Sequence, residues 1–211
     1  MAKDLARAIG YRYVDSGAMY RAVTLYALEH GLIKDGRPDE AALEAALPMI
    51  KIDFKTTPEG QHTMLNGRDV ENEIRSLRVS SAVSPVAAIA AVRHRLVKMQ
   101  QEFGKEKGIV MDGRDIGTTV FSHAELKIFV NASAETRAER RYQELMAKGG
   151  DSSLTYDDVL ANVIERDNID MSRKESPLRR ADDAIDLDNS HMTIAEQNQW
   201  LLDRYNEAVT R

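Results

Sequence analysis

Apolar and polar residues alternate with two different spacings along the chain, and each spacing predicts a different kind of secondary structure. The first ten residues have helical spacing that ends at Gly10, and YRYVD at 11–15 resembles a short strand. A helix is expected from Ser16 onward, with one apolar face made by Met19, Val23, Tyr26 and Ala27. A second helix is expected over 39–47.

The middle of the chain changes to the alternation typical of strands. IKIDF alternates apolar and polar residues, and Asn66-Gly67 is a pair that favours a tight hairpin turn. Residues from about 50 to 70 are therefore predicted to form a small antiparallel insertion. Helical spacing resumes near Glu71, and one long helix is expected from Pro85 to about Phe103, with the proline in its first turn.

Short apolar strands and helices alternate in the second half. Strands are predicted at 108–112, 126–131 and 183–188. Helices are predicted from about 133, from Thr155 to about 167, and after the Thr193–Glu196 capping box. A flexible link is expected at 149–153. Strands separated by helices favour a mainly parallel sheet with helices on both faces. Ligands of such sheets bind beyond the carboxyl ends of the strands.

Composition narrows the class of protein. The 211 residues are 43% hydrophobic and 30% charged, which fits one globular domain. The chain has no cysteine, which excludes disulfides and thiolate metal sites. No apolar run approaches the ~20 residues of a membrane span, and the N-terminus lacks the apolar core of a secretory signal. A net charge of −5 disfavours long nucleic acids as partners, although arginines gather in the second half.

Two predicted strands end in similar polar motifs. One ends in Asp15-Ser16-Gly17 with Arg21 a turn later, and the other ends in Asp112-Gly113-Arg114-Asp115. Arginine binds phosphate bidentately, glycine permits close backbone approach, and a helix N-terminus offers free amide donors. Either motif alone is typical of a plain turn, but two of them at the ends of one parallel sheet favour a phosphate site.

Two more charged clusters follow. Arg137, Arg140 and Arg141 are expected on one face of a helix, where they could bind an anion or pair with Glu135, Glu139 and Glu144. The segment 165–173 carries many charges at a predicted helix end. It suits a mobile flap that closes on a charged ligand and equally suits an exposed loop.

Four motifs in order resemble bacterial cytidylate kinases: DSGAMYRAVT at 15–24, SPVAAIAAVR at 84–93, DGRDIGTTVF at 112–121 and ERDNIDMSR at 165–173. SPLRRADDAIDLDNS at 176–190 resembles the end of that family's lid and its last strand. The resemblance implies one α/β domain, a P-loop NTPase-like parallel sheet flanked by helices. Its expected parts are a core at 1–48, 71–135 and 182–211, an antiparallel insertion at about 49–70, and a lid at about 136–181.

The resemblance also implies an activity. The family transfers the γ-phosphoryl group of ATP to CMP or dCMP, using Mg²⁺, in pyrimidine nucleotide metabolism. We therefore expect a cytoplasmic, monomeric phosphotransferase that has ATP and CMP or dCMP as partners and binds neither nucleic acid nor membrane. UMP, dTMP and shikimate kinases are alternatives, against which the insertion and the set Ser84, Arg93 and Asp115 argue.

Residue roles carry over by position in the matching motifs. Ser84, Arg93 and Asp115 resemble the residues that read cytosine; Arg166 and Asp170 resemble the sugar-binding pair, and Arg173 a lid arginine near the monophosphate. Ser16, Arg21 and Arg114 resemble ligands of the α-phosphate, and Arg137, Arg140 and Arg141 resemble lid arginines on ATP. Arg114, Arg166 and Asp112 are the catalytic candidates; no direct metal ligand is expected, although Asp15 and Asp112 could act on Mg²⁺ through water.

The chain departs from the family at one point. The family starts with a strand and a glycine-rich loop ending in Gly-Lys-Ser/Thr, whereas no G-x-x-x-x-G-K-[ST] occurs in these 211 residues. We expect an N-terminally truncated sequence, explained by a misassigned start, a true truncation or a degenerate relative. The chain is then expected to be impaired as a kinase and unstable, and the alternative is a non-catalytic CMP-binding remnant.

Overall fold

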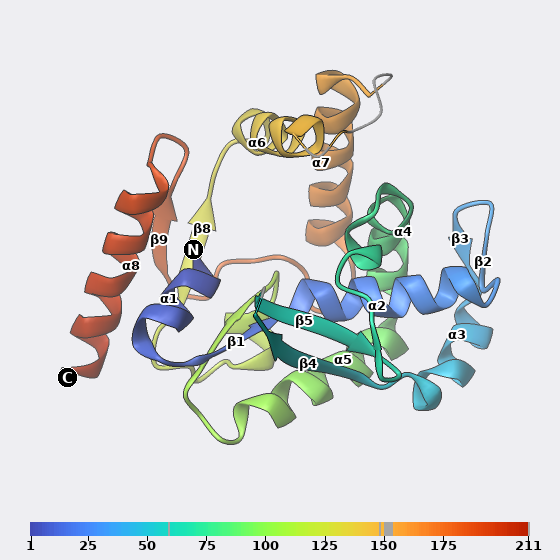
Figure 1. Cartoon of the computed structure of the whole chain (residues 1–211), viewed down its shortest axis with the longest axis horizontal. Helices are drawn as coiled ribbons and strands as arrows, with labels where there is room; N and C mark the ends of the chain where they lie inside the picture. The colour runs from blue at the N-terminus through green and yellow to red at the C-terminus, as the bar shows by residue number, and fades with distance from the viewer. Residues whose placement is uncertain (59, 148, 150–153, 211) are drawn as a thin grey trace.

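The computed structural model describes residues 1–58, 60–147, 149 and 154–210 (Figure 1). Helices and short strands alternate through much of the chain. The α-helices are α1 (Ala2–Ile9), α2 (Ser16–Glu29), α3 (Glu40–Ala46), α4 (Leu77–Ala88), α5 (Ala90–Gly104), α6 (Ala134–Ala147), α7 (Tyr156–Ser172) and α8 (Ile194–Val209). Shorter turns are the 3₁₀ segments at Leu47–Met49 and Glu73–Arg75 and a π-helical segment at Ile116–Val120. Within the described part of the chain, no helix is both long and apolar enough to cross a membrane.

The parallel strands form two separate pairs. β1 (Arg12–Asp15) pairs with β7 (Ile109–Asp112), and β8 (Ile128–Asn131) pairs with β9 (Ile185–Asp188). Strand positions and parallel direction agree with the prediction, and helices flank both pairs. The single continuous sheet is not present among the described residues, because no described strand hydrogen-bonds to both β7 and β8.

The largest apolar core surrounds α2 rather than the parallel strands. Met19, Val23, Tyr26 and Ala27 are buried as predicted, but Ala18, Ala22 and Leu25 on other faces are buried as well. A helix that is apolar nearly all round is enclosed on several sides. Packing from α4, α5 and the strand insertion around α2 explains why the predicted single apolar face was too narrow.

The antiparallel insertion is confirmed. β4 (Ile52–Thr57) pairs with β5 (Gly60–Leu65), which pairs with the short β6 (Arg68–Asp69). Asn66 and Gly67 make the turn with φ of 50° and 83°, the conformation that Asn-Gly tolerates. A second hairpin follows α2, and each of its strands has two residues. It pairs β2 (Ile33–Lys34) with β3 (Arg37–Pro38).

Two helix predictions were wrong in their bounds. The expected helix over 85–103 is two helices, α4 and α5, because Ile89 between them is extended with φ −68° and ψ 123°. Pro85 therefore lies inside α4, and Ser76 caps that helix by accepting from the Val79 amide. The helix from Thr155 runs to Ser172 instead of about 167, so most of the charged segment 165–173 is helical rather than a loop.

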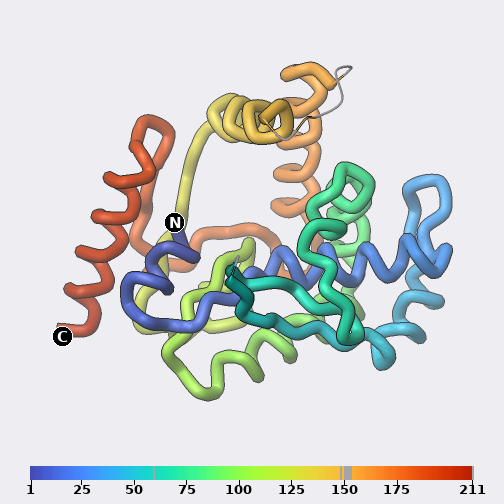
Figure 2. Tube along the Cα trace, viewed as in Figure 1, coloured from blue at the N-terminus to red at the C-terminus, as the bar shows by residue number. Residues whose placement is uncertain are grey.

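Helices α6 and α7 pack against each other and stand above the rest of the molecule. Figure 2 shows the chain rising from β8 into α6 and descending through α7 toward β9. This hairpin occupies the expected lid, whose role as a moving part stays a prediction. Of the predicted flexible link at 149–153, only Gly149 lies within the described residues.

Candidate functional site

The carboxyl ends of β1 and β7 bring the two predicted strand-end motifs together. Asp15 and Asp112 are direct neighbours in the parallel register. The Ser16 hydroxyl, at the start of α2, donates to the Asp112 carbonyl oxygen at 2.6 Å. A Cβ on Gly113 would lie 2.2 Å from Ser16 Oγ, so only glycine permits this approach. Parallel pairing therefore joins motifs that lie about a hundred residues apart in the sequence.

Asp15 orients the first phosphate-site arginine. Its Oδ1 caps α2 by accepting from the Ala18 amide at 2.8 Å, and its Oδ2 accepts from Arg21 Nη2 at 2.9 Å. Arg75 lies on the other side, with its Nη2 3.5 Å from the same Oδ2. Both carboxylate oxygens of Asp15 are thus already bonded, one in a helix cap and one in an ion pair. Its action on a metal-bound water stays a prediction.

Asp112 has an unusual carboxyl group. Tyr13 donates its hydroxyl to Asp112 Oδ2 at 3.0 Å. Part of the residue faces solvent, but the protein around the carboxyl and then the negative charge of Asp15 raise the pKa of Asp112 to about 6. At neutral pH the ionised form of this carboxylate costs folding free energy. Such a carboxylate suits a position that positive charge approaches when a ligand binds.

We expect Asp112→Asn to raise Tm at about pH 8 and to change it little near pH 4. The folded chain holds this proton more tightly than an unfolded chain, whose aspartate has the ordinary pKa of 3.8. The ionised carboxylate therefore costs stability in a window that opens above the unfolded pKa and is complete above the folded one. Thermal unfolding from pH 4 to 8 measures the effect, with exposed Glu106→Gln as control. A Tm difference that is constant with pH would contradict it.

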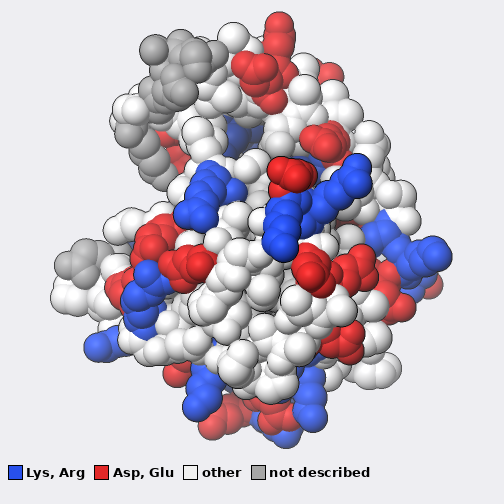
Figure 3. Space-filling view, turned by 90° about the vertical axis from the view of Figure 1, so that its right-hand side faces the viewer, with Lys and Arg blue, Asp and Glu red and all other residues white. Residues whose placement is uncertain are grey.

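A cavity of about 250 Å³ opens above these strand ends and is rich in arginine. Four arginines from separate elements line it with Ser80, Val83 and Glu144; they are Arg21, Arg75, Arg141 and Arg166. Figure 3 shows basic side chains in the recess beneath the α6–α7 hairpin. Burial, and then the charge of Arg114, lower the pKa of Arg166. This concentration of positive charge suits a compact polyanion such as phosphate.

Two of the three predicted base-reading residues are in direct contact. Arg93 on α5 and Asp115 after β7 form an ion pair whose side chains are 1% and 3% exposed. Arg93 also donates to the Ala87 carbonyl oxygen at 3.1 Å, and buried Ser84 lies on α4. A buried, oriented pair of donor and acceptor can distinguish one hydrogen-bonding edge from another.

Asp170 connects the end of α7 to this centre. It accepts from Arg114 Nε at 3.0 Å through one oxygen and from Arg173 Nη1 at 2.9 Å through the other. Burial, and then the charge of Arg93, lower the pKa of Arg173. Asp170 of the predicted sugar pair and Arg173 therefore form one network with Arg114 of the β7 motif.

The three predicted ATP arginines share one face of α6, as expected, but their side chains bond to different partners. Arg137 makes a forked pair with Asp167, at 3.0 and 2.6 Å, and Arg140 reaches Asn189 after β9, donating to its side-chain and backbone oxygens. Only Arg141 lines the arginine cavity, and it pairs with Glu144 at 2.9 Å. The long Arg140 side chain leaves its neighbours because its guanidinium bonds to Asn189.

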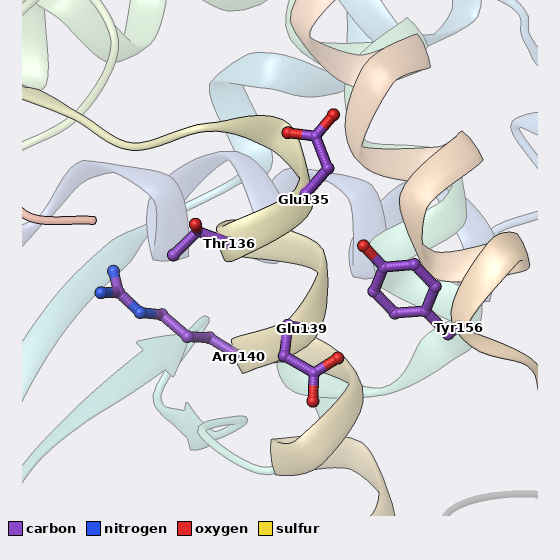
Figure 4. A pocket seen from close by; sticks show the side chains of 5 residues that line it. All are labelled: Glu135, Thr136, Glu139, Arg140 and Tyr156. Carbon is purple, nitrogen blue, oxygen red and sulfur yellow. The ribbon is translucent and has the colours of Figure 1, made fainter. Parts of the chain in front are cut away.

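A second, shallower cavity of about 470 Å³ lies between α6 and the start of α7 (Figure 4). Its lining is Glu135, Thr136, Glu139, Arg140 and Tyr156. Figure 4 shows Arg140 extending away from the two glutamates and from Tyr156. Two carboxylates with one arginine turned aside make this a poorer anion site than the arginine cavity.

Sequence reasoning missed Arg75 and its partner Glu71. Glu71 Oε1 accepts from Arg75 Nε at 2.9 Å and from Nη2 at 2.5 Å, while Oε2 accepts from the Thr63 amide and hydroxyl. Gln61 of β5 donates to the Tyr13 carbonyl oxygen at 2.6 Å. The insertion is thus bonded to β1 and to the arginine cavity. The four-residue spacing of Glu71 and Arg75 was the available signal.

Comparison with known proteins agrees with this geometry. The family model described as cytidylate kinase matches residues 1–207. A cytidylate kinase of Phocaeicola vulgatus is 61% identical over 211 residues, which cover 99% of this chain and 91% of the relative. Cytidylate kinases of Porphyromonas gingivalis and Flavobacterium johnsoniae are 58% and 51% identical, with the same coverage. This chain therefore belongs to the cytidylate kinase family of enzymes.

Proposed function

We propose that this protein phosphorylates CMP and dCMP, with ATP and Mg²⁺ as the donor system. The observation that carries the proposal is the combination of a buried Arg93–Asp115 pair with a cavity lined by four arginines. A nucleoside monophosphate needs both features, because one end is a flat polar base and the other is a dianion. The monomeric state and cytoplasmic location expected from sequence stay predictions.

Base selection follows from the chemistry of the buried pair. Cytosine has an N4 amino group that donates and N3 and O2 atoms that accept. Asp115 can accept from N4, and Arg93 and the Ser84 hydroxyl can donate to the acceptors. Uracil has a carbonyl at the N4 position, which would face the carboxylate and leave its charge unpaired. A buried polar site rejects such a partner strongly.

Sugar and phosphate fit the neighbouring network. Arg166 and Asp170 are proposed to bind the sugar, while Ser16, Arg21, Arg114 and Arg173 bind the monophosphate. Arg21 supports this role because Asp15 already holds its guanidinium at 2.9 Å beside the cavity. Ordering a phosphate arginine before binding reduces the entropy lost on binding.

The remaining residues are proposed to serve transfer. In phosphoryl transfer the protein mainly positions the substrates and offsets charge. We propose that Arg114 and Arg166 neutralise the transferred group and that Arg137, Arg140 and Arg141 approach ATP from the α6–α7 hairpin. Mg²⁺ would enter with ATP and neutralise its phosphates. Asp112, with one oxygen bonded to Tyr13, fits a metal-bound water better than Asp15, whose two oxygens are both bonded.

We further propose that a polypeptide of these 211 residues, assayed by itself, binds CMP but transfers phosphate slowly. The reason is that these residues contain no G-x-x-x-x-G-K-[ST], which would supply backbone donors and a lysine for the ATP phosphates. A CMP-binding protein without catalysis is accordingly the second candidate function.

Calorimetric titration with CMP, UMP and ATP separately, followed by a coupled assay for ADP, tests both proposals. We expect CMP to bind more tightly than UMP, ATP to bind weakly, and turnover to fall below about 1 per second, the low end for kinases. Equal affinity for CMP and UMP would contradict the substrate assignment. Turnover at ordinary kinase rates would contradict the slow transfer and exclude the non-catalytic candidate.

A further inference from the structure

A buried glutamine next to the base site has no role in the site described above. Gln100 lies on α5 and is 1% exposed. Among the residues that the structure describes, neither its amide nitrogen nor its amide oxygen has a hydrogen-bond partner. Nearly all buried polar side chains are paired, so an unpaired amide at this depth requires an explanation.

Tyr20 connects this glutamine to the base-reading pair. The tyrosine, on α2, is 7% exposed, and its hydroxyl is also without a hydrogen-bond partner in the described part of the chain. Burial raises the pKa of Tyr20 to about 12, and the hydroxyl is close enough to be affected by Arg93, Asp115 and the Gln100 amide. The Arg93 guanidinium carbon lies 5.3 Å from the centre of the Tyr20 ring.

Helix geometry explains how Gln100 and Arg93 share the same partner. They are seven residues apart, which places them two turns apart on one face of α5. Tyr20 thus contacts the Arg93 guanidinium with its ring, while its hydroxyl lies near the Gln100 amide without forming a hydrogen bond to it. Any tilt of the tyrosine ring would also tilt the guanidinium, since cation–π contact depends on the position of the cation over the ring.

We propose that Gln100 is a positioning residue for the base site, acting through Tyr20 to hold the Arg93–Asp115 pair in the orientation that prefers cytosine to uracil. This inference rests on the proposed function, since it assigns a cause to the selectivity of that same site. Gln100 keeps a buried amide that has no hydrogen-bond partner among the described residues, where a leucine of similar size would leave no polar group unpaired. Such a local inconsistency is typical of functional positions.

The test is the ratio of the dissociation constants for UMP and CMP, measured by calorimetry together with Tm. We expect Gln100→Leu to lower this ratio about fivefold, within the range of coupling between contacting residues. Its Tm should stay equal or rise, because an unpaired buried amide is removed. Tyr20→Phe should lower the ratio similarly, and the double variant should show little further loss. Gln101→Leu, at the adjacent exposed position, is the matched control and should keep the ratio.

Three results would overturn the inference. An unchanged ratio in Gln100→Leu, beside a wild type that prefers CMP, would refute it while leaving the proposed function standing. Equal weakening of CMP and UMP with a lower Tm would assign Gln100 a structural role only. A wild-type chain without preference for CMP would refute the proposed function and this inference together.

Discussion

Replacing Asp115 with alanine should produce the largest loss of stability of any single change at this site. The substitution removes the partner of Arg93, whose side chain is 1% exposed, and leaves a buried, uncompensated positive charge. Breaking a buried ion pair from one side costs about 3–5 kcal/mol of unfolding free energy. Urea unfolding, monitored by circular dichroism, measures this as a lower midpoint.

The same residue should also decide base binding. Asp115→Asn keeps the size and an acceptor oxygen but loses the charge, so it is expected to fold better than the alanine variant. Its CMP affinity should still fall at least about tenfold, because hydrogen bonds to charged groups contribute roughly 1.5–3 kcal/mol. Glu73→Ala is the control, since it removes an exposed pair with Arg68 at 3.3 Å and should cost less than about 1 kcal/mol. Similar midpoints for Asp115→Ala and Glu73→Ala would contradict the structural importance of the pair.

Replacing Arg21 with methionine should produce the largest loss of CMP affinity at the phosphate end. Arg21 lines the arginine cavity and is oriented by Asp15, so it is ready to form a charge-assisted hydrogen bond with a phosphate. Loss of such a bond should weaken CMP binding by about 10- to 100-fold. Affinity for cytidine, which has no phosphate, should change by less than about twofold, because the base site is untouched.

Comparison of CMP with cytidine separates phosphate binding from general damage. Arg21→Lys should give an intermediate loss, since lysine keeps the charge but not the planar fork. Arg37→Met, on the exposed β2–β3 hairpin, controls for the loss of one positive charge and should leave both affinities unchanged. Parallel weakening of CMP and cytidine in Arg21→Met would show that the arginine supports the fold rather than the phosphate.

Local elements were predictable where the signal was local. The cap at Gly10, the Asn66-Gly67 turn and the Thr193–Glu196 capping box all appear in the structure as expected. Each depends on residues within four positions of one another, so chain propensity decides it. The extended Ile89, which divides α4 from α5, had no such signal and was missed.

The candidate site also has parts that local sequence signals predicted and parts that they did not. Motifs at the ends of two predicted strands were sufficient to propose Asp15, Arg21, Asp112 and Arg114 as neighbours, because parallel strands place their carboxyl ends together. Helical spacing placed Arg137, Arg140 and Arg141 on one face, but it does not reveal that the Arg140 side chain bonds to Asn189, 49 positions away. Arg75 had only its local spacing from Glu71 as a signal, and that spacing does not reveal its position beside Asp15.

The amino-acid sequence by itself determined which short helices and strands form, their order, and the arginine-rich motifs that the family shares. Those features follow from side-chain periodicity and from turn and cap chemistry, which act over a few residues. Tertiary structure alone decided that Arg93 and Asp115 are buried together and that Asp170 joins Arg114 to Arg173. It also decided that the Gln100 amide is enclosed with no hydrogen-bond partner among the described residues. Burial and ion pairing depend on distances across the fold, and packing sets those distances.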